Sequence, residues 1–315
     1  MTPAVSILMS VYNGQAYLAE AMESLLAQSF RDFELIVIDD GSTDRSPAIL
    51  AKFAEKDARI RRITQANAGL TVSLNRAAKL AKASLLAHMD PDDVAVPNRL
   101  EKQVAFLNAN PQIILLGSQV VLTDPYGTPY QWPVHELSHD GIYDKLMKGE
   151  GWAVVHPAAM MRRDAFERIG GYDQRFRTSQ DFDLWLRLAE IGRLANLPEP
   201  LLFYRQHLAS ANFAKAEQQK RLKVWILDEA RRRLGLPPVD PATLPPPPMS
   251  DPFESRRRWG WAAIKERRFA AAGRHAIDNL KARPTSAEMW RLLGCCVRDK
   301  FLPRNSLSRV ITGEG

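Results

Sequence analysis

Three carboxylates stand close together in Asp90-Pro91-Asp92-Asp93, directly after the apolar run Leu85–Met89. Like charges at this spacing repel one another, and each raises the proton affinity of its neighbours. A hard divalent cation that shares the oxygens removes this repulsion, and Mg²⁺ or Mn²⁺ suits such ligands best. The pattern therefore predicts a divalent-metal site. A solvated turn in which Asp92 or Asp93 caps the following helix is the alternative.

A second polar stretch, Asp39-Asp40-Gly41-Ser42-Thr43-Asp44, ends the apolar run that begins at Phe33. The carboxylate of Asp40 is suited to accept hydrogen bonds from a nucleobase N–H or from ribose hydroxyls. A turn followed by a helix cap is the alternative, and for Asp44 the cap is the favoured interpretation. We therefore expect Asp40 to bind a ligand and Asp44 to begin a helix.

A third stretch, Ser10-Val11-Tyr12-Asn13-Gly14, ends the first apolar run. Tyr12 offers an aromatic face on which a nucleobase could stack, while Asn13 and Gly14 suit a sharp turn. Packing of Tyr12 within its own loop is the alternative. The chain has neither GxGxxG nor GxxxxGK[ST], which argues against Rossmann dinucleotide binding and against a P-loop.

Short apolar strands and helical patterns alternate along the first third of the chain. Strands are expected at Val5–Ser10, Phe33–Asp39, Ile60–Thr64 and Leu85–Met89. Helices are expected at Ala16–Gln28, after Asp44 and at Leu70–Leu80. Such alternation predicts a parallel sheet covered on both faces, whose ligands lie outside the carboxyl ends of the strands. The three polar stretches should therefore meet at one edge of the sheet.

The alternation weakens after Pro97, where the second half of the site is expected to form. We expect a helix after Pro97, a strand at Ile113–Leu122, a helix after Gln180, an edge or late strand at Pro200–Gln206 and a basic helix at Ala214–Gly235. Residues 237–252 contain the run Pro245–Pro248 and predict an extended linker. Residues 253–315 show helical patterns at Phe253–Ala282 and Ser286–Asp299, separated at Pro284. We therefore expect a catalytic domain at 1–236, a linker at 237–252 and a basic helical hairpin at 253–315.

Composition limits the classes of protein that remain. The net charge is +7, but residues 253–315 hold 14 of the 43 Lys and Arg and only 6 of the 36 Asp and Glu, so the basic excess belongs to the tail. Cys295 and Cys296 are adjacent, cannot cross-link distant segments and offer no metal-ligand spacing. No apolar run approaches the ~20 residues of a membrane-spanning helix, and no signal peptide is apparent. A cytoplasmic protein in a reducing compartment is expected.

Six motifs in order, over about residues 3–212, resemble glycosyltransferase family 2. They are VSILMSVYNG, ELIVIDDGSTDRS, AHMDPDD, GGYDQRF, QDFDLWLRL and YRQHLAS. The resemblance implies an α/β fold of GT-A type, a Rossmann-like mixed sheet flanked by helices, here followed by a small C-terminal helical segment. It also implies inversion at the anomeric carbon, a nucleotide-activated sugar and a divalent metal.

The resemblance assigns the donor side by position. Asp40 matches the residue that contacts the base, and Tyr12 the residue that packs on it, with Asn13 in the same turn. Asp90 and Asp92 match the DXD pair. Asp92 is thereby implied as a direct ligand of Mn²⁺ or Mg²⁺, and Asp90 as a contact of the ribose or of a metal-bound water.

Other positions follow from the same resemblance. His207 matches a late histidine that completes the metal shell. Asn67 and Gly69 lie where similar proteins close over the base and ribose, and Asp93 is expected to orient the acidic group or cap a helix. His88 stands where Arg is more usual, which puts any diphosphate contact from that position in doubt.

On the acceptor side, Gln180-Asp181 stands at the Glu-Asp motif of the family. Asp181 matches the base that takes the acceptor proton; without the resemblance it would be interpreted as an N-cap. Gln180 keeps hydrogen bonding but lacks the charge of Glu. His156, beside Pro157, matches a His-Pro pair near the acceptor, and a hydrogen-bonded core histidine is the alternative.

The expected function is metal-dependent hexosyl transfer with inversion, from a UDP- or dTDP-sugar to a hydroxyl of a saccharide or lipid-linked saccharide. Assembly of bacterial surface polysaccharide or glycolipid is the expected setting, and no nucleic acid is expected as a partner. A non-catalytic nucleotide-sugar binding module is the alternative, because Gln180 and His88 depart from the family. A nucleotidyltransferase would need a Gly- and Lys-rich phosphate loop, which the N-terminal region lacks.

The basic tail generates a separate hypothesis. Its Trp and cationic residues could rest on an anionic membrane, which would place the protein peripherally at the inner face of the membrane. The residues concerned are Arg256, Arg257, Arg258, Trp259, Trp261, Lys265, Arg267 and Arg268. A solvated helical hairpin with core tryptophans, a homo-oligomer contact and a contact with another protein are the alternatives.

Overall fold

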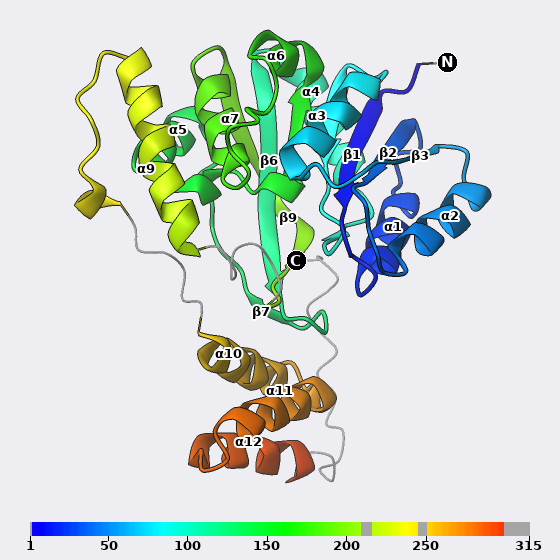
Figure 1. Ribbon diagram of the computed structural model, residues 1–315, viewed down its shortest axis with the longest axis vertical. Coiled ribbons are helices and arrows are strands. Elements are labelled where there is room, and N and C mark those ends of the chain that lie inside the picture. The colour runs from blue at the N-terminus through cyan, green and yellow to red at the C-terminus, as the bar shows by residue number, and fades with distance from the viewer. Residues whose placement is uncertain (1, 209–215, 245–250, 299–315) are drawn as a thin grey trace, which may run out of the picture. The chain divides into compact units, whose positions relative to one another are not determined.

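The computed structural model describes residues 2–208, 216–244 and 251–298 (Figure 1). The predicted run Pro245–Pro248 and the tail beyond Arg298 lie outside these residues. The chain divides into two compact units. The larger comprises residues 1–127 and 131–250, and the smaller comprises residues 128–130 and the chain from 251 onward.

The larger unit is built on a mixed sheet with the strand order β3-β2-β1-β4-β8-β6-β9-β5. The first four strands are parallel, β8 is antiparallel to both β4 and β6, and β9 runs parallel to β6. The strands are β1 (Val5–Val11), β2 (Phe33–Asp39), β3 (Ile60–Thr64), β4 (Leu85–His88), β5 (Val94–Ala95), β6 (Ile113–Thr123), β7 (Pro129–Gln131, off this path), β8 (Met160–Arg162) and β9 (Arg193–Arg205). The parallel first half and the mixed sheet were both predicted and are confirmed.

Helices cover both faces of this sheet, so the side chains of the central strands are buried on both sides. Leu8 and Ile36 pack into one core with Leu74 and Trp185, while Met9, which points to the opposite face, is also fully buried. The helices of the larger unit are α1 (Leu18–Leu26), α2 (Ser46–Lys56), α3 (Leu70–Leu80), α4 (Arg99–Ala109), α5 (His139–Met147), α6 (Arg163–Arg168), α7 (Gln180–Ala189) and α9 (Ala216–Arg233).

Strand β9 is longer than the strand predicted at Pro200–Gln206, because it begins at Arg193. Its pairing with β6 passes from Ser118↔Leu197 to Gln119↔Pro200, so that two residues of β9 bulge out of the ladder. Proline cannot donate to a ladder and is tolerated at such a bulge. The prolines therefore interrupt the pairing without ending the strand.

The start of the predicted linker packs on the larger unit instead of extending away from it. The backbone N–H of Val239 donates to Asp228 at 2.7 Å, and Leu244 is buried in the same core as Leu227. The prediction of a linker from residue 237 is wrong for residues 237–244, since Val239 and Leu244 pack against the core of the larger unit.

Within residues 251–298 the smaller unit forms three helices, α10 (Pro252–Lys265), α11 (Phe269–Ala282) and α12 (Ala287–Arg298), so the predicted hairpin is wrong. The single helix expected at Phe253–Ala282 is broken after α10, where Arg267 adopts a φ of 55°. A left-handed residue at this position ends many helices and is usually Gly. Arginine gave no such signal in the sequence.

Helices α10 and α12 pack against each other in the small unit. A Cβ added at Gly260 would lie 2.5 Å from the Leu292 side chain, so this glycine permits the close packing of α10 and α12.

Two tryptophans of the tail contribute to the interior of the small unit. Trp259 is 1% exposed, and Trp261 donates to Glu288 at 2.9 Å. These two side chains follow the core alternative and not the membrane hypothesis. Within the described ranges, no helix is both long and apolar enough to span a bilayer.

Replacement of Trp185 by Ala is expected to lower the free energy of unfolding by about 3–5 kcal/mol, because it leaves a cavity where this side chain of α7 is fully buried. Trp132, which is 56% exposed and belongs to the same unit, supplies the matched control, and its replacement by Ala should cost less than about 0.5 kcal/mol. Urea unfolding of both variants measures this. Equal losses would contradict the core described here.

Candidate active site

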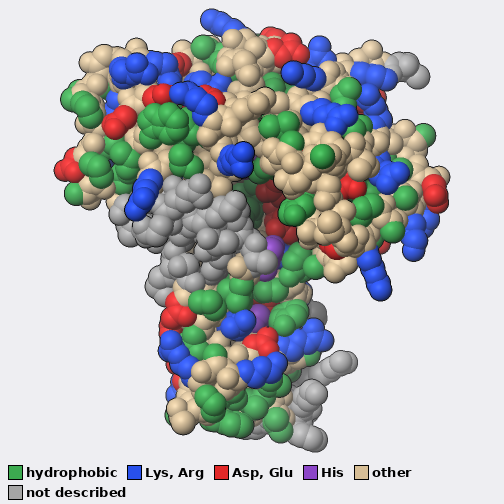
Figure 2. All heavy atoms as spheres, viewed as in Figure 1, with side chains coloured by type: hydrophobic (Ala, Val, Ile, Leu, Met, Phe, Trp, Pro, Cys, Tyr) green, Lys and Arg blue, Asp and Glu red, His purple; other side chains and the backbone are tan. Residues whose placement is uncertain are grey.

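A cavity of about 720 Å³ opens at the carboxyl ends of the parallel strands. Figure 2 shows acidic side chains in a hollow of the larger unit. Nine of the predicted site residues line the cavity, namely Tyr12, Asp40, Asn67, Gly69, Asp90, Asp92, His156, Gln180 and Asp181. The sheet therefore brings the predicted donor and acceptor residues to one place.

The predicted metal ligands lie against each other. His207 Nε2 and Asp92 Oδ2 are 2.9 Å apart, although 115 residues separate them in sequence. Both side chains are partly accessible, at 17% and 28% respectively. Imidazole nitrogen and carboxylate oxygen are both ligands of divalent metals. The pair is thus placed so that a cation could be held between strand β9 and the loop after β4.

The three carboxylates converge as predicted, with one ligand atom from each within 4.8 Å of the others. Asp93 turns inward, where its Oδ1 accepts from the backbone N–H of Arg205 at 2.8 Å. Burial raises its pKa well above the ordinary value, and the charges of Asp92 and Asp90 add to this. Helix α4 has Asn98 at its N-cap, so the capping alternative for Asp92 and Asp93 is wrong.

Arg205 compensates the acidic cluster and was not predicted. Its guanidinium is buried, donates to the Asp92 carbonyl at 2.8 Å and to Glu20 at 2.6 Å, and lies over the Tyr17 ring. The only sequence signal was its place two residues before His207. Arg177 also lines the cavity without having been predicted, and nothing in its local sequence marked it.

Asp40 holds the loop that covers the donor side. Its carboxylate accepts from Gln65 Nε2 at 2.6 Å and from the backbone N–H groups of Ala68 at 2.9 Å and Gly69 at 2.8 Å. Burial acts to raise the pKa of Asp40, but these hydrogen bonds outweigh it and hold the pKa below its usual value. Asp40 is therefore ionised, and it positions Gly69, the N-cap residue of α3.

Asn13 does not line the cavity, contrary to its predicted donor contact. It adopts a φ of 52°, and its side-chain oxygen accepts from the backbone N–H of Thr43 at 2.8 Å. It thus joins the loops after β1 and β2 and leaves the neighbouring Tyr12 ring 55% exposed at the cavity. Asn13 was selected for its place in the motif, but its amide is used within the protein.

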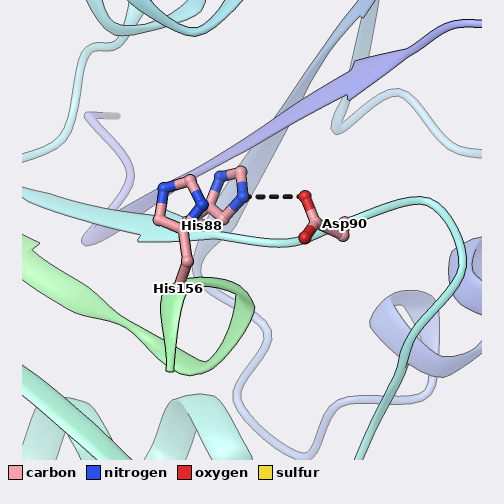
Figure 3. A group of neighbouring side chains, drawn as sticks. All are labelled: His88, Asp90 and His156. Carbon is pink, nitrogen blue, oxygen red and sulfur yellow. Dashed lines mark hydrogen bonds and ion pairs between the residues drawn. The ribbon is translucent and has the colours of Figure 1, made fainter. Parts of the chain in front are cut away.

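His156 is both buried and at the cavity wall. Its ring stacks on His88 with centroids 3.7 Å apart (Figure 3). Its Nε2 contacts the Tyr172 hydroxyl at 2.7 Å. Burial, together with the neighbouring His88, lowers the pKa of His156 to about 3. Burial likewise lowers the pKa of His88 to about 3, assisted by Arg99. Both imidazoles are therefore neutral at physiological pH.

Gln180 and Asp181 begin helix α7. The N-cap is Ser179, with a φ of 58°, so the alternative interpretation of Asp181 as an N-cap is wrong. Asp181 lies in the first turn, where the helix dipole favours a carboxylate. Burial lowers the pKa of Lys223 on α9, whereas the negative charge of Asp181 raises it, so the two side chains interact electrostatically. The carboxylate that faces the cavity is thus placed to accept a proton.

Comparison with known proteins gives a consistent picture. A sequence profile described as glycosyl transferase family 2 matches residues 6–170. The putative glycosyltransferase EpsE of Bacillus subtilis is 36% identical over 244 residues, which cover 76% of this chain and 85% of EpsE. The O-antigen biosynthesis glycosyltransferase WbnJ of Escherichia coli is 33% identical over 207 residues, or 64% of this chain and 80% of WbnJ.

Solved structures share the fold. TarS 1–349 of S. aureus in complex with UDP matches with a TM-score of 0.57 and 16% identity, over 98% of this chain and 95% of that one. The mannosyltransferase PcManGT of Pyrobaculum calidifontis, in complex with GDP-Man and Mn²⁺, matches with a TM-score of 0.56 and 18% identity, over 96% and 88%. The mixed sheet flanked by helices is thus the GT-A arrangement.

Replacement of His156 by Phe is expected to flatten the acid dependence of stability. An unfolded histidine has a pKa of about 6.5, so acidification below that value protonates the unfolded chain while folded His156 stays neutral down to about pH 3. Stability is lost as pH falls through this window and returns as pH rises. The loss between about pH 7.5 and about pH 5 should shrink by about 2 kcal/mol in the variant. Urea unfolding at both values measures it, and an unchanged loss would contradict a neutral His156.

Proposed function

Since the chain belongs to glycosyl transferase family 2, we propose that it transfers a sugar, with inversion, from a UDP- or dTDP-sugar to a hydroxyl of a saccharide or lipid-linked saccharide. The observation that carries the proposal is the contact of His207 with Asp92, a residue that lines the same cavity as Asp181. A cation-binding pair and a carboxylate base are the two groups that direct displacement of a diphosphate requires.

The names of similar proteins support the substrate class. WbnJ is named for O-antigen biosynthesis, and the structural neighbours were solved with UDP, UDP-GlcNAc or GDP-Man. Assembly of a bacterial surface polysaccharide by a cytoplasmic enzyme is the setting that we propose. The exposed face of Tyr12 suits stacking of the base, beside the loop that Asp40 holds.

Asp92 and His207 would hold the metal, with Asp90 directed at the ribose or at a metal-bound water. When bound, the cation would offset the negative charge that builds on the departing diphosphate. A set that joins an imidazole to a carboxylate suits Mn²⁺ at least as well as Mg²⁺, which prefers oxygen alone. PcManGT, whose structure contains Mn²⁺, supports this choice.

Asp181 would take the proton of the acceptor hydroxyl as the oxygen attacks from the face opposite the diphosphate. Its carboxylate lines the cavity and interacts electrostatically with Lys223 on α9. Gln180, at the start of the same helix, would orient the hydroxyl by hydrogen bonding. His156 would border the acceptor as a neutral group, which adds no charge next to the base.

Replacement of Asp181 by Asn should abolish transfer while leaving donor binding within about twofold of wild type. A positioned base contributes ~10²-fold to 10⁴-fold in rate, and the isosteric amide cannot accept the proton. Turnover and calorimetric donor binding, both with Mn²⁺, measure the two effects. Asp140, whose side chain is 85% exposed, provides the control Asp140→Asn. Normal turnover by Asp181→Asn would refute the assignment.

Separate replacements of Asp92 and His207 by Ala should each weaken Mn²⁺-dependent nucleotide binding by roughly tenfold or more, which corresponds to ~1.4 kcal/mol. Binding in the presence of excess chelator should be the same for both variants and for wild type, and this serves as the internal control. Calorimetry with and without Mn²⁺ measures the difference. Retention of the full Mn²⁺ effect in either variant would remove that residue from the metal site.

The alternative of a non-catalytic binding module makes a different prediction. A transferase should release sugar slowly from its correct donor by hydrolysis when no acceptor is present, whereas a binding module should not. Hydrolysis that Asp181→Asn still supports but Asp92→Ala does not would favour the enzyme. The absence of hydrolysis for every nucleotide sugar that binds would favour the module.

A further inference from the structure

His88 lies beneath the cavity and contacts a residue that lines it. The ring ends strand β4, is 1% exposed, and places its Nε2 2.9 Å from Asp90 Oδ1 (Figure 3). Burial raises the pKa of Asp90, but when this carboxyl is ionised it only accepts hydrogen bonds, so a neutral His88 then carries its single proton on Nε2 and donates it to Asp90. The ring is therefore held in one tautomer.

The other nitrogen of the ring has no partner. His88 Nδ1 is buried and forms no hydrogen bond among the described residues. A buried polar atom that remains unpaired is rare and costs stability. An apolar side chain would avoid that cost, so the contact with Asp90 is the gain that the imidazole provides at this position.

Neighbouring groups fix the plane of the His88 ring. His156 stacks on it with an interplanar angle of 20°, and Tyr172 fixes His156 through its hydroxyl. On the backbone side, the buried Arg99 donates to the His88 carbonyl at 2.8 Å. A ring held in this way determines the direction in which the Asp90 carboxylate points.

The trio of His88, Asp90 and His156 has ligand atoms close enough for a metal, within 4.8 Å of one another. The stacked arrangement argues against a shared ion, because an ion between two parallel rings would lie about half their separation out of each ring plane, whereas imidazole binds metals in its plane. Orientation of Asp90 is the role that this geometry does suit.

We propose that His88 is a positioning residue, which donates from below to Asp90 and fixes that carboxylate for the nucleotide. The proposal rests on the proposed function, since it assumes that Asp90 faces the donor. His88 does not border the cavity itself, unlike Asp90 and His156. It therefore does not replace a phosphate-binding Arg, and it acts only through Asp90. The same stack joins the donor side, at Asp90, to the acceptor side, at His156.

Two matched amides test the proposal in the full-length protein. The amide nitrogen of Gln can take the place of His Nε2, whereas the shorter Asn cannot reach Asp90. Binding of UDP, dTDP and GDP to the wild-type protein with Mn²⁺ is measured first by calorimetry. The nucleotide that binds most tightly is then used with the variants. His88→Gln should bind it within about twofold of wild type, and His88→Asn about five- to tenfold more weakly. His275→Asn, which replaces a buried histidine of the small unit, should leave affinity unchanged.

A double-mutant cycle separates positioning from general damage. Asp90→Asn alone should weaken nucleotide binding. Adding His88→Asn should weaken it by less than a further twofold, because the carboxylate that His88 orients is already missing. Thermal unfolding midpoints of all variants show whether the fold is kept.

Three outcomes would overturn the proposal: equal affinity of His88→Asn and wild type, equal weakening by Gln and Asn, or independent effects that multiply in the double variant. The proposed function fails differently, since it fails if wild type binds no nucleoside diphosphate in any condition.

Discussion

Three carboxylates within 4.8 Å of one another create the constraint around which the site is organised. Their repulsion is relieved in a different way at each residue. Asp93 turns into the protein, where burial favours its protonated form. Asp90 meets a neutral imidazole, His88, that can donate to it. Asp92 has an oxygen beside the partly exposed ring of His207, an imidazole that can also bind metals. One acidic motif thus yields three environments.

A very short strand establishes these environments. β5 follows the acidic motif directly and pairs antiparallel with β9, so that Val94 lies opposite Phe203 and Ala95 opposite Leu202. Continuing this register back along the chain brings Asp92 towards Arg205 and His207. The backbone ladder, and not a contact between flexible loops, therefore sets the distance between the two predicted ligands. The bulge earlier in β9 adjusts where that strand ends.

Local patterns were sufficient to predict the first half of the fold. The strands that lead to Asp40 and Asp90 are short apolar runs, and a parallel sheet gathers the residues that follow them at one edge. Whether a side chain at that edge faces the cavity or is hydrogen-bonded within the protein depends on partners that are distant in the sequence. The side-chain oxygen of Asn13 accepts a hydrogen bond from Thr43, and the carboxylate of Asp40 accepts hydrogen bonds from the loop that follows β3.

Other features had no local signal at all. Arg205 and Lys223 reach the site through the packing of β9 and α9, which a reading of neighbouring residues cannot foresee. The stack of His88 on His156 joins residues 68 positions apart, through strands whose order the sequence leaves open. In the small unit, Arg267 occupies a left-handed turn where a glycine would have marked the end of a helix.

The central claim is that Asp92 and His207 together hold a divalent cation that binds with the donor. Anomalous diffraction from crystals grown with Mn²⁺ and a nucleoside diphosphate tests it most directly. A manganese peak is expected at coordination distance, about 2.0–2.3 Å, from both Asp92 and His207, with phosphate oxygens completing the shell. A bound nucleotide without a manganese peak at that position, or with His207 still hydrogen-bonded to Asp92, would contradict it.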